Sequence, residues 1–124
     1  MAQAGRHFTF REFDCRDGTK CPVKAHDEVR ELCARFLDPL RDRFGPVTIL
    51  SGYRTVDYNR QVGGARRSFH IYTLDPGRGV AADVRCARGT VADWWAFLEA
   101  RNPGGLGRYV WGCHVDTRLQ RARW

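Results

Sequence analysis

The segment Val47-Thr48-Ile49-Leu50-Ser51-Gly52-Tyr53-Arg54 predicts a short buried strand that runs directly into a polar loop. Its first four residues are apolar or β-branched, a composition typical of strands in a protein core. Loops at the ends of strands are common places for binding and catalytic residues. We therefore expect a strand at 47–50 and a functional site built near its end.

The segment before this strand has the pattern of the main core helix. From Ala25 to Phe44 apolar residues recur at helical spacing, and Gly45-Pro46 marks the end of the pattern. Pro39 lies inside it and has no backbone N–H to donate, so we expect a kink or a break near Leu37–Asp38.

The N-terminal segment is expected to be an arm attached to a single domain. Residues 8–21 alternate aromatic and polar residues and then turn at Asp17-Gly18, which favours a short strand or an extended arm ending in a loop. The chain has 124 residues, 43% of them hydrophobic, which suffices for one domain with one core. We expect one domain over residues 1–124, with residues 1–21 as its arm.

The segment after the first strand carries alternating helix and strand signals. Thr55 can cap a short helix that extends to about Val62, and a glycine-rich loop follows. The later elements are expected to be a strand at Val80–Arg85, a helix capped by Thr90 and Asp93, one or two strands within Gly107–Thr117, and a basic tail ending at Trp124. These signals predict an α+β fold with helices packed on a small antiparallel sheet.

The charge balance favours an anionic partner. Lys+Arg number 21 against 14 Asp+Glu, which gives a formal net charge of +7. Nucleic acid, anionic lipid and cell-wall polymer are all compatible with that charge. The arginines are scattered, and no helix-turn-helix, finger or aromatic sheet signature accompanies them, so no specific nucleic-acid binding is expected.

The sequence shows no membrane span and no secretory signal. No stretch approaches about 18 apolar residues, and MAQAGRHFTF lacks a basic start and an apolar core. We therefore expect a protein made in the cytoplasm.

Five cysteines are present without a Cys-x-x-Cys pair, so a thiolate metal site has little support. Cys33 lies on the apolar face of the predicted helix and is expected to be a buried small hydrophobic residue. A disulfide between Cys86 and Cys113 is conceivable if their segments pair. Reduced thiols are the alternative.

Two of the four histidines stand beside predicted strands and aspartates. Ser68-Phe69-His70 leads to Ala81-Ala82-Asp83, and His114-Val115-Asp116 lies near the C-terminus, whereas His7 and His26 are expected at the surface. Catalytic zinc sites use three protein ligands and keep one position for water. His70, Asp83 and His114 would meet that demand, and two hydrogen-bonded, partly buried histidines are the alternative.

The order of motifs resembles the zinc D-Ala-D-Ala carboxypeptidases and peptidoglycan endopeptidases, especially their compact phage-type branch. The resemblance covers most of the chain, and its fragments occur in family order. They are Ser51-Gly52-Tyr53-Arg54, Tyr58-Asn59-Arg60-Gln61-Val62-Gly63-Gly64-Ala65, Ser68-x-His70, Gly79-x-Ala81-x-Asp83, Gly104-Gly105-Leu106-Gly107-Arg108-Tyr109, His114-Val115-Asp116 and Arg121-x-Arg123-Trp124. The resemblance implies an α+β fold of the hedgehog and D-Ala-D-Ala-peptidase type.

The resemblance also implies roles for single residues. His70, Asp83 and His114 would bind Zn²⁺, while Arg54 would bind a substrate carboxylate or, alternatively, form a structural ion pair. Ser68 resembles the family serine that hydrogen-bonds near the metal or the substrate. Asp116 would be either the catalytic general base or a group that orients a ligand.

Two departures from the family pattern concern the ligands and the base. Residues 73–78 appear inserted between His70 and Asp83. Asp75-Pro76-Gly77 favours a turn that would leave both ligands in place, and a reshaped substrate groove is the alternative. The positions three and two before His114, where many relatives have a glutamate or a histidine base, hold Trp111 and Gly112.

The resemblance predicts a zinc peptidase that cleaves peptidoglycan peptides at the cell wall, as a phage lysin or as part of a virion. The alternative is a non-catalytic virion, tail or wall-binding protein that keeps the peptidase fold. The expected partners are peptidoglycan peptide and, for a phage protein, other virion proteins.

Overall fold

A computed structural model describes residues 2–75 and 77–124, and it has the expected α+β fold. The helices are α1 (His26–Leu32), α2 (Asp38–Phe44), α3 (Val56–Gln61) and α4 (Val91–Ala100), and the strands are β1 (Val47–Ser51), β2 (Ala81–Cys86), β3 (Gly105–Arg108), β4 (Cys113–Asp116) and β5 (Ala122–Arg123). None of the described helices is long and apolar enough to cross a membrane.

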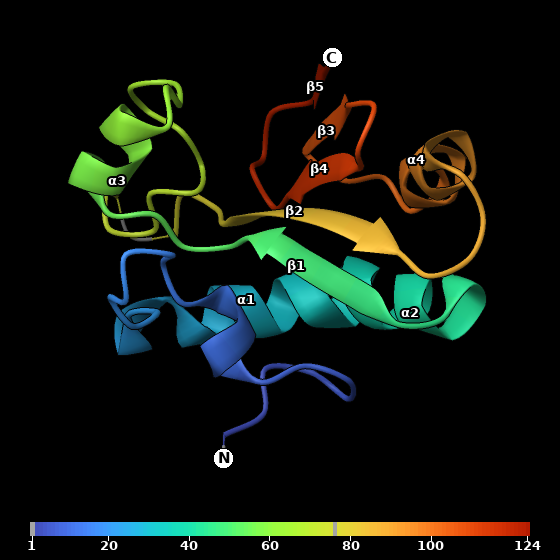
Figure 1. Cartoon of the computed structure of the whole chain (residues 1–124), viewed down its shortest axis with the longest axis horizontal. Helices are drawn as coiled ribbons and strands as arrows, with labels where there is room; N and C mark the ends of the chain where they lie inside the picture. The colour runs from blue at the N-terminus through green and yellow to red at the C-terminus, as the bar shows by residue number, and fades with distance from the viewer. Residues whose placement is uncertain (1, 76) are drawn as a thin grey trace.

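The five strands form one sheet in the order β1-β2-β4-β3-β5 (Figure 1). Neighbouring strands are antiparallel except for β3 and β5, which are parallel, so the expectation of a wholly antiparallel sheet is wrong at this edge. The basic tail supplies β5: Trp124 N donates to Leu106 O, and Arg108 N donates to Trp124 O. This pairing of distant segments carries no local sequence signal.

The α-helical hydrogen-bond pattern of the main helix is interrupted next to the place where Pro39 led us to expect a kink or a break. Between α1 and α2 the chain forms a π-helical segment at Cys33–Leu37, directly before Pro39. The wider π turn accommodates a residue that lacks an N–H and whose ring crowds the preceding turn. In Figure 1 the resulting run of helix lies along one side of β1 and β2.

The N-terminal arm packs onto the core, and of the two expected forms, a short strand or an extended arm ending in a loop, the strand does not form in residues 8–21. Only an isolated bridge joins Gln3 to Thr9, and a 3-10 helix occupies Phe10–Phe13. Glu12 accepts a hydrogen bond from the backbone N–H of Thr9, which fixes the start of this helix. The aromatic residues therefore reach the core through a tight turn rather than through a strand.

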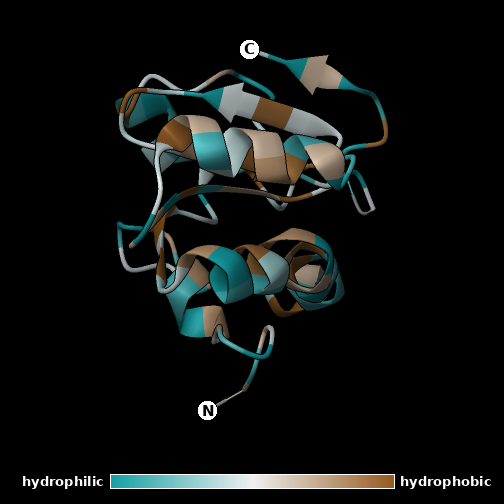
Figure 2. Cartoon of the chain, turned by 90° about the vertical axis from the view of Figure 1, so that its right-hand side faces the viewer, coloured by the Kyte–Doolittle hydropathy of each residue, from teal (hydrophilic) through white to brown (hydrophobic). Residues whose placement is uncertain are grey.

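The sheet has one apolar face and one polar face. Ala82, Val84, Leu106 and Val115 are buried in the hydrophobic core, which the helical run and α4 complete. Figure 2 shows hydrophobic and hydrophilic positions alternating around these helices, as expected for helices with one buried face. The residues that alternate with the core positions on β2 and β4 face the other way.

Helix α4 begins at the predicted cap. Near its C-terminal end, Glu99 binds two arginines of the C-terminal segment. Asp93 N donates to Thr90 Oγ1 at 3.2 Å, and Thr90 N donates to Asp93 Oδ2 at 2.9 Å. Glu99 accepts hydrogen bonds from Arg121 and from Arg123, the latter at 2.9 and 3.0 Å. The two arginines thereby tie the tail to α4.

The Glu99 contact predicts a local effect on β5. Replacing Glu99→Gln removes the charge that two arginines share, so hydrogen exchange at the Trp124 amide should become severalfold faster while the core amides stay protected. Glu31→Gln is the matched control, because Glu31 pairs with Arg35 on the surface of the helical run.

The same contact predicts a pH dependence. Hydrogen bonding from Arg123 lowers the pKa of Glu99 to about 2. The contribution of this carboxylate is therefore complete above the usual glutamate pKa and is lost as the pH falls towards 2. Protection of the Trp124 amide that did not decrease over this range in the wild type would contradict the assignment.

Candidate metal centre

The polar face of the sheet brings Asp83 and His114 together. The two residues are directly opposite each other in the antiparallel pair of β2 and β4, so their side chains project from the same face. His70 comes from the loop after α3. Its backbone N donates to Ser68 Oγ at 3.1 Å, and its carbonyl accepts from Arg54 N at 2.7 Å.

These three side chains converge on one point. Each offers a ligand atom, and the three atoms lie within 4.8 Å of one another. Oδ1 of Asp83 lies 3.1 Å from His70 Nε2 and 3.0 Å from His114 Nδ1. All three residues are buried, so a charge placed among them is shielded from water.

The hydrogen bonds around the two histidines fix which nitrogen faces the centre. His70 Nδ1 lies 2.7 Å from the carbonyl oxygen of Gly52, which can only accept, so Nδ1 carries the proton. Nε2 of His70 is then left with a lone pair, and it has no hydrogen-bond partner among the described residues. An orphaned buried lone pair beside a carboxylate fits a divalent cation.

His114 is oriented in the same manner from the other side. Its Nε2 lies 2.7 Å from Asp116 Oδ2, which leaves Nδ1 towards the centre. Two imidazole nitrogens and one carboxylate make a donor set that suits zinc, and a partner behind each histidine is the usual arrangement at metal sites. The residues present therefore fit a bound metal ion.

Burial and charge move the pKa values of the triad in different directions. Burial tends to raise the pKa of Asp83, but its close contacts with His114 and His70 outweigh it and hold that pKa well below its usual range. Burial lowers the pKa of His70. Burial also opposes the charged form of His114, yet its contacts with Asp116 and Asp83 raise its pKa overall.

Asp116 is placed behind the triad and not in open solvent. Its side chain is completely buried, and it accepts from Gly105 N at 2.7 Å and from Arg118 through Nε and Nη2. With these partners and His114, both carboxylate oxygens are occupied. The sequence left two roles open for Asp116, the general base and a group that orients a ligand. This geometry favours the second role, in which Asp116 orients His114.

Arg54 and Ser68, the predicted substrate-binding residues, both line the cleft over the triad. The guanidinium of Arg54 donates to Ser51 Oγ and to Asn59 Oδ1, each at 3.1 Å, and its Nη2 lies 3.6 Å from Asp83 Oδ2. Ser68 supports the His70 backbone, as described above. The structure thus places Arg54 beside the triad with several N–H groups still free.

His70 and Asp83 come together although the insertion separates them in the sequence. Pro76 of the predicted turn lies outside the described residues. Beyond it, Arg78 donates to the carbonyls of Ser68 and Arg67 and lies over the Phe69 ring, 3.8 Å from its centroid. Arg78 therefore holds the C-terminal end of the insertion against the segment that carries His70.

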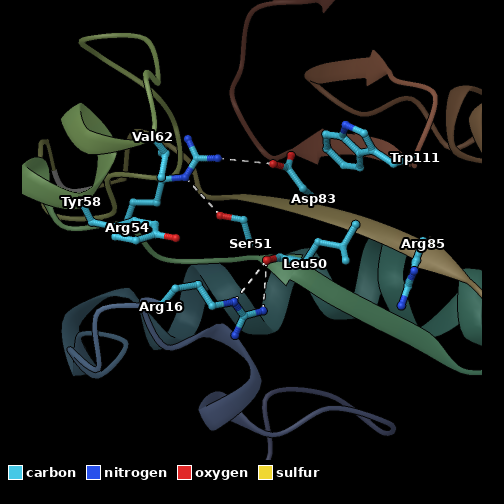
Figure 3. Close-up of a pocket in the computed structure, with 9 residues that line it drawn as sticks. All are labelled: Arg16, Leu50, Ser51, Arg54, Tyr58, Val62, Asp83, Arg85 and Trp111. Atoms are coloured by element: carbon cyan, nitrogen blue, oxygen red, sulfur yellow. Dashed lines mark hydrogen bonds and ion pairs between the residues drawn. The ribbon is translucent and has the colours of Figure 1, made fainter.

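At one of the two positions before His114 the structure leaves no room for a base. A Cβ on Gly112 would lie 2.2 Å from the carbonyl oxygen of Val84, so this position has no room for a side chain. Trp111 occupies the position before it and lines the cleft, where Figure 3 shows its indole beside Asp83.

The cleft has an aromatic wall that the sequence analysis did not assign. It encloses about 510 Å³ and is lined in part by Tyr109, Trp111 and Trp124. The Trp124 ring lies 4.8 Å from that of His114, and its Nε1 donates to Tyr109 Oη at 2.7 Å. Tyr109 in turn stacks on Trp111 with centroids 4.6 Å apart. The signal for this wall in the sequence was the presence of aromatic residues shortly before His114 and at the last position.

Comparisons with known proteins give one family and one partial similarity. The model of a family described as Peptidase M15 matches residues 6–117. Mouse desmocollin-2 is 33% identical over 75 residues, which cover 60% of this chain and 7% of that protein. The chain thus corresponds to a small fraction of desmocollin-2, and that similarity assigns no role to the site.

The orientation of His114 predicts an effect of Asp116 on metal affinity. Asp116→Asn keeps the shape of the side chain but weakens its hold on His114 Nε2, so Zn²⁺ affinity should fall about 10- to 100-fold. Calorimetric titration with Zn²⁺ measures it, and Asp42→Asn, at an exposed ion pair, is the control. Equal affinities for the wild type and Asp116→Asn in a folded protein would show that Asp116 does not support the metal centre.

Proposed function

The chain belongs to the peptidase M15 family, and from this premise we propose that it is a zinc-dependent peptidase that hydrolyses peptidoglycan peptides. The observation that carries the proposal is the convergence of His70 Nε2, His114 Nδ1 and the Asp83 carboxylate in one buried cluster. When bound there, zinc would polarise the scissile carbonyl and lower the pKa of a water molecule.

The residues around the triad would hold the substrate and the ligands in place. Arg54 has planar, paired donors that suit a carboxylate, and it lies at the wall of the cleft. Ser68 fixes the backbone of His70, and Asp116 keeps the Nε2 proton of His114 directed away from the centre. A D-Ala-D-Ala carboxypeptidase or an endopeptidase would both use this arrangement.

The proposed substrate is compatible with the charge and organisation of the chain. A net charge of +7 would favour adsorption to anionic wall polymers. Delivery as a phage lysin or in a virion is part of the proposal and rests on the motif resemblance. We also propose a single domain over residues 1–124, supported by the shared core of Phe8, Phe13 and Leu37.

One observation favours a second function, a non-catalytic wall-binding or virion protein. Among the described residues that line the cleft, Asp83 is the one carboxylate, and it belongs to the triad. A positioned general base contributes about 10²- to 10⁴-fold to the rates of many enzymes. A site without one would turn over slowly or serve binding alone.

Replacing one ligand distinguishes these functions. We expect purified wild type to contain stoichiometric zinc and to release muropeptides from peptidoglycan, and His114→Ala to lose both properties, since it removes one of three ligands. His7→Ala is the matched control, because His7 pairs with Asp42 at the surface. Metal analysis and chromatography of the digest measure the two properties.

The possible outcomes separate the two proposals. A wild type that binds zinc but releases nothing would support the non-catalytic function. A folded wild type that binds no zinc and cleaves nothing would refute the peptidase proposal.

A further inference from the structure

A second pocket continues the cleft beyond the triad. It encloses about 380 Å³ and shares Arg54, Val62, Asp83 and Trp111 with the cleft over the metal centre. Figure 3 shows its lining residues over β1 and β2, with Asp83 directed towards Arg54 on one side. A ligand that occupies the triad cleft can therefore extend into this pocket.

The pocket is positively charged. Arg16, Arg54 and Arg85 line it, against Asp83 as its one acidic residue. Within residues 2–75 and 77–124, neither Arg16 nor Arg85 has a carboxylate at ion-pair distance, whereas Asp83 is already compensated by Arg54 and His114. Two cationic groups in the pocket therefore have no counter-charge from this part of the protein.

Arg16 is held rigidly by the strand beside it. The β1–β2 register shifts between Ile49 and Ser51, and the guanidinium of Arg16 donates to the carbonyls of Ile49 and Leu50 at this irregularity. These bonds use Nε and Nη2, so Nη1 is left without a hydrogen-bond partner among the described residues. A fixed guanidinium with free donors loses little conformational entropy when it binds an anion.

Arg85 approaches from the next strand. It lies two residues after Asp83 on β2, so both side chains project from the same face of the sheet. The other walls are apolar and are provided by Leu50, Tyr58, Val62 and Trp111. Apolar walls reduce the local dielectric constant and strengthen the attraction between a carboxylate and the arginines.

We propose that this pocket is a specificity subsite for an acidic residue of the peptide substrate. The subsite takes a free carboxylate at Arg85, with Arg16 adding to the positive potential from the other side of Leu50, and the apolar part of the same peptide segment lies against Trp111 and Val62. This carboxylate is distinct from the one assigned to Arg54. The inference rests on the proposed peptidase function for the identity of the ligand as a peptide.

The test compares two peptides that differ in one group. Both are the stem pentapeptide L-Ala-γ-D-Glu-L-Lys-D-Ala-D-Ala, one with the free α-carboxylate of glutamate and one with the carboxamide there. Their dissociation constants are measured calorimetrically on the full chain, as wild type, Arg85→Gln and Arg11→Gln. Arg85 is chosen over Arg16 because it is exposed on β2, whereas Arg16 also supports the backbone of β1.

We expect the wild type and Arg11→Gln to bind the carboxylate peptide about tenfold more tightly, the size of one charge-assisted hydrogen bond. In Arg85→Gln this ratio should fall to about 1, and the preference of the wild type should weaken with added salt. Arg11 is an exposed arginine that lines neither pocket, so it controls for net charge.

Two results would overturn the subsite: equal binding of both peptides by the wild type, or an unchanged preference in a folded Arg85→Gln. Failure of the peptidase proposal is recognised separately, because peptide binding is also measured with His114→Ala. A carboxylate preference that persists there, with no cleavage by zinc-loaded wild type, would support the subsite and refute the catalytic function.

Discussion

The pairing of β2 with β4 is the constraint on which the rest of the site depends. In this register Asp83 stands opposite His114, while Val84 and Val115 of the same strands point into the core. Strand side chains alternate, so a slip of one residue would bury the carboxylate among apolar residues and expose the valines. The hydrophobic core therefore fixes how Asp83 and His114 face each other, although its own side chains take no part in the site.

Much of the fold could be predicted because its signals are local. The break before Pro39, the strand at β1 and the caps at Thr55 and Thr90 each depend on a few neighbouring residues, and each was confirmed. Where the outcome depends on distant partners, prediction failed. The aromatic residues of the arm formed a 3-10 helix against the core, and the tail became β5 through pairing with β3.

The residues of the site also fall into two groups, those that the sequence predicted and those whose contacts depend on distant partners. Motif order singled out His70, Asp83 and His114, which the structure brings within 4.8 Å of one another, although their roles as zinc ligands stay a prediction. The contacts of Arg78 with the segment before His70 and of Trp124 with the His114 ring are made across the fold, so the motif that contains Trp124 did not specify them. The missing base is a further case: the absence was visible in the sequence, but the carbonyl of Val84, which leaves no room for a side chain at position 112, was not.

Charge compensation links the two halves of the cleft. Asp83 is balanced by Arg54 at 3.6 Å and by His114, and Asp116 is balanced more tightly by Arg118 at 2.7 Å. A cation among the triad would supply the counter-charge that Asp83 now takes from Arg54. The guanidinium would then keep its bonds to Ser51 and Asn59 and present its remaining donors to a substrate. The long contact of Arg54 with Asp83 and the short contact of Arg118 with Asp116 thus suit different tasks. Arg54 must be available to a ligand, whereas Arg118 must hold the Asp116 carboxylate in place.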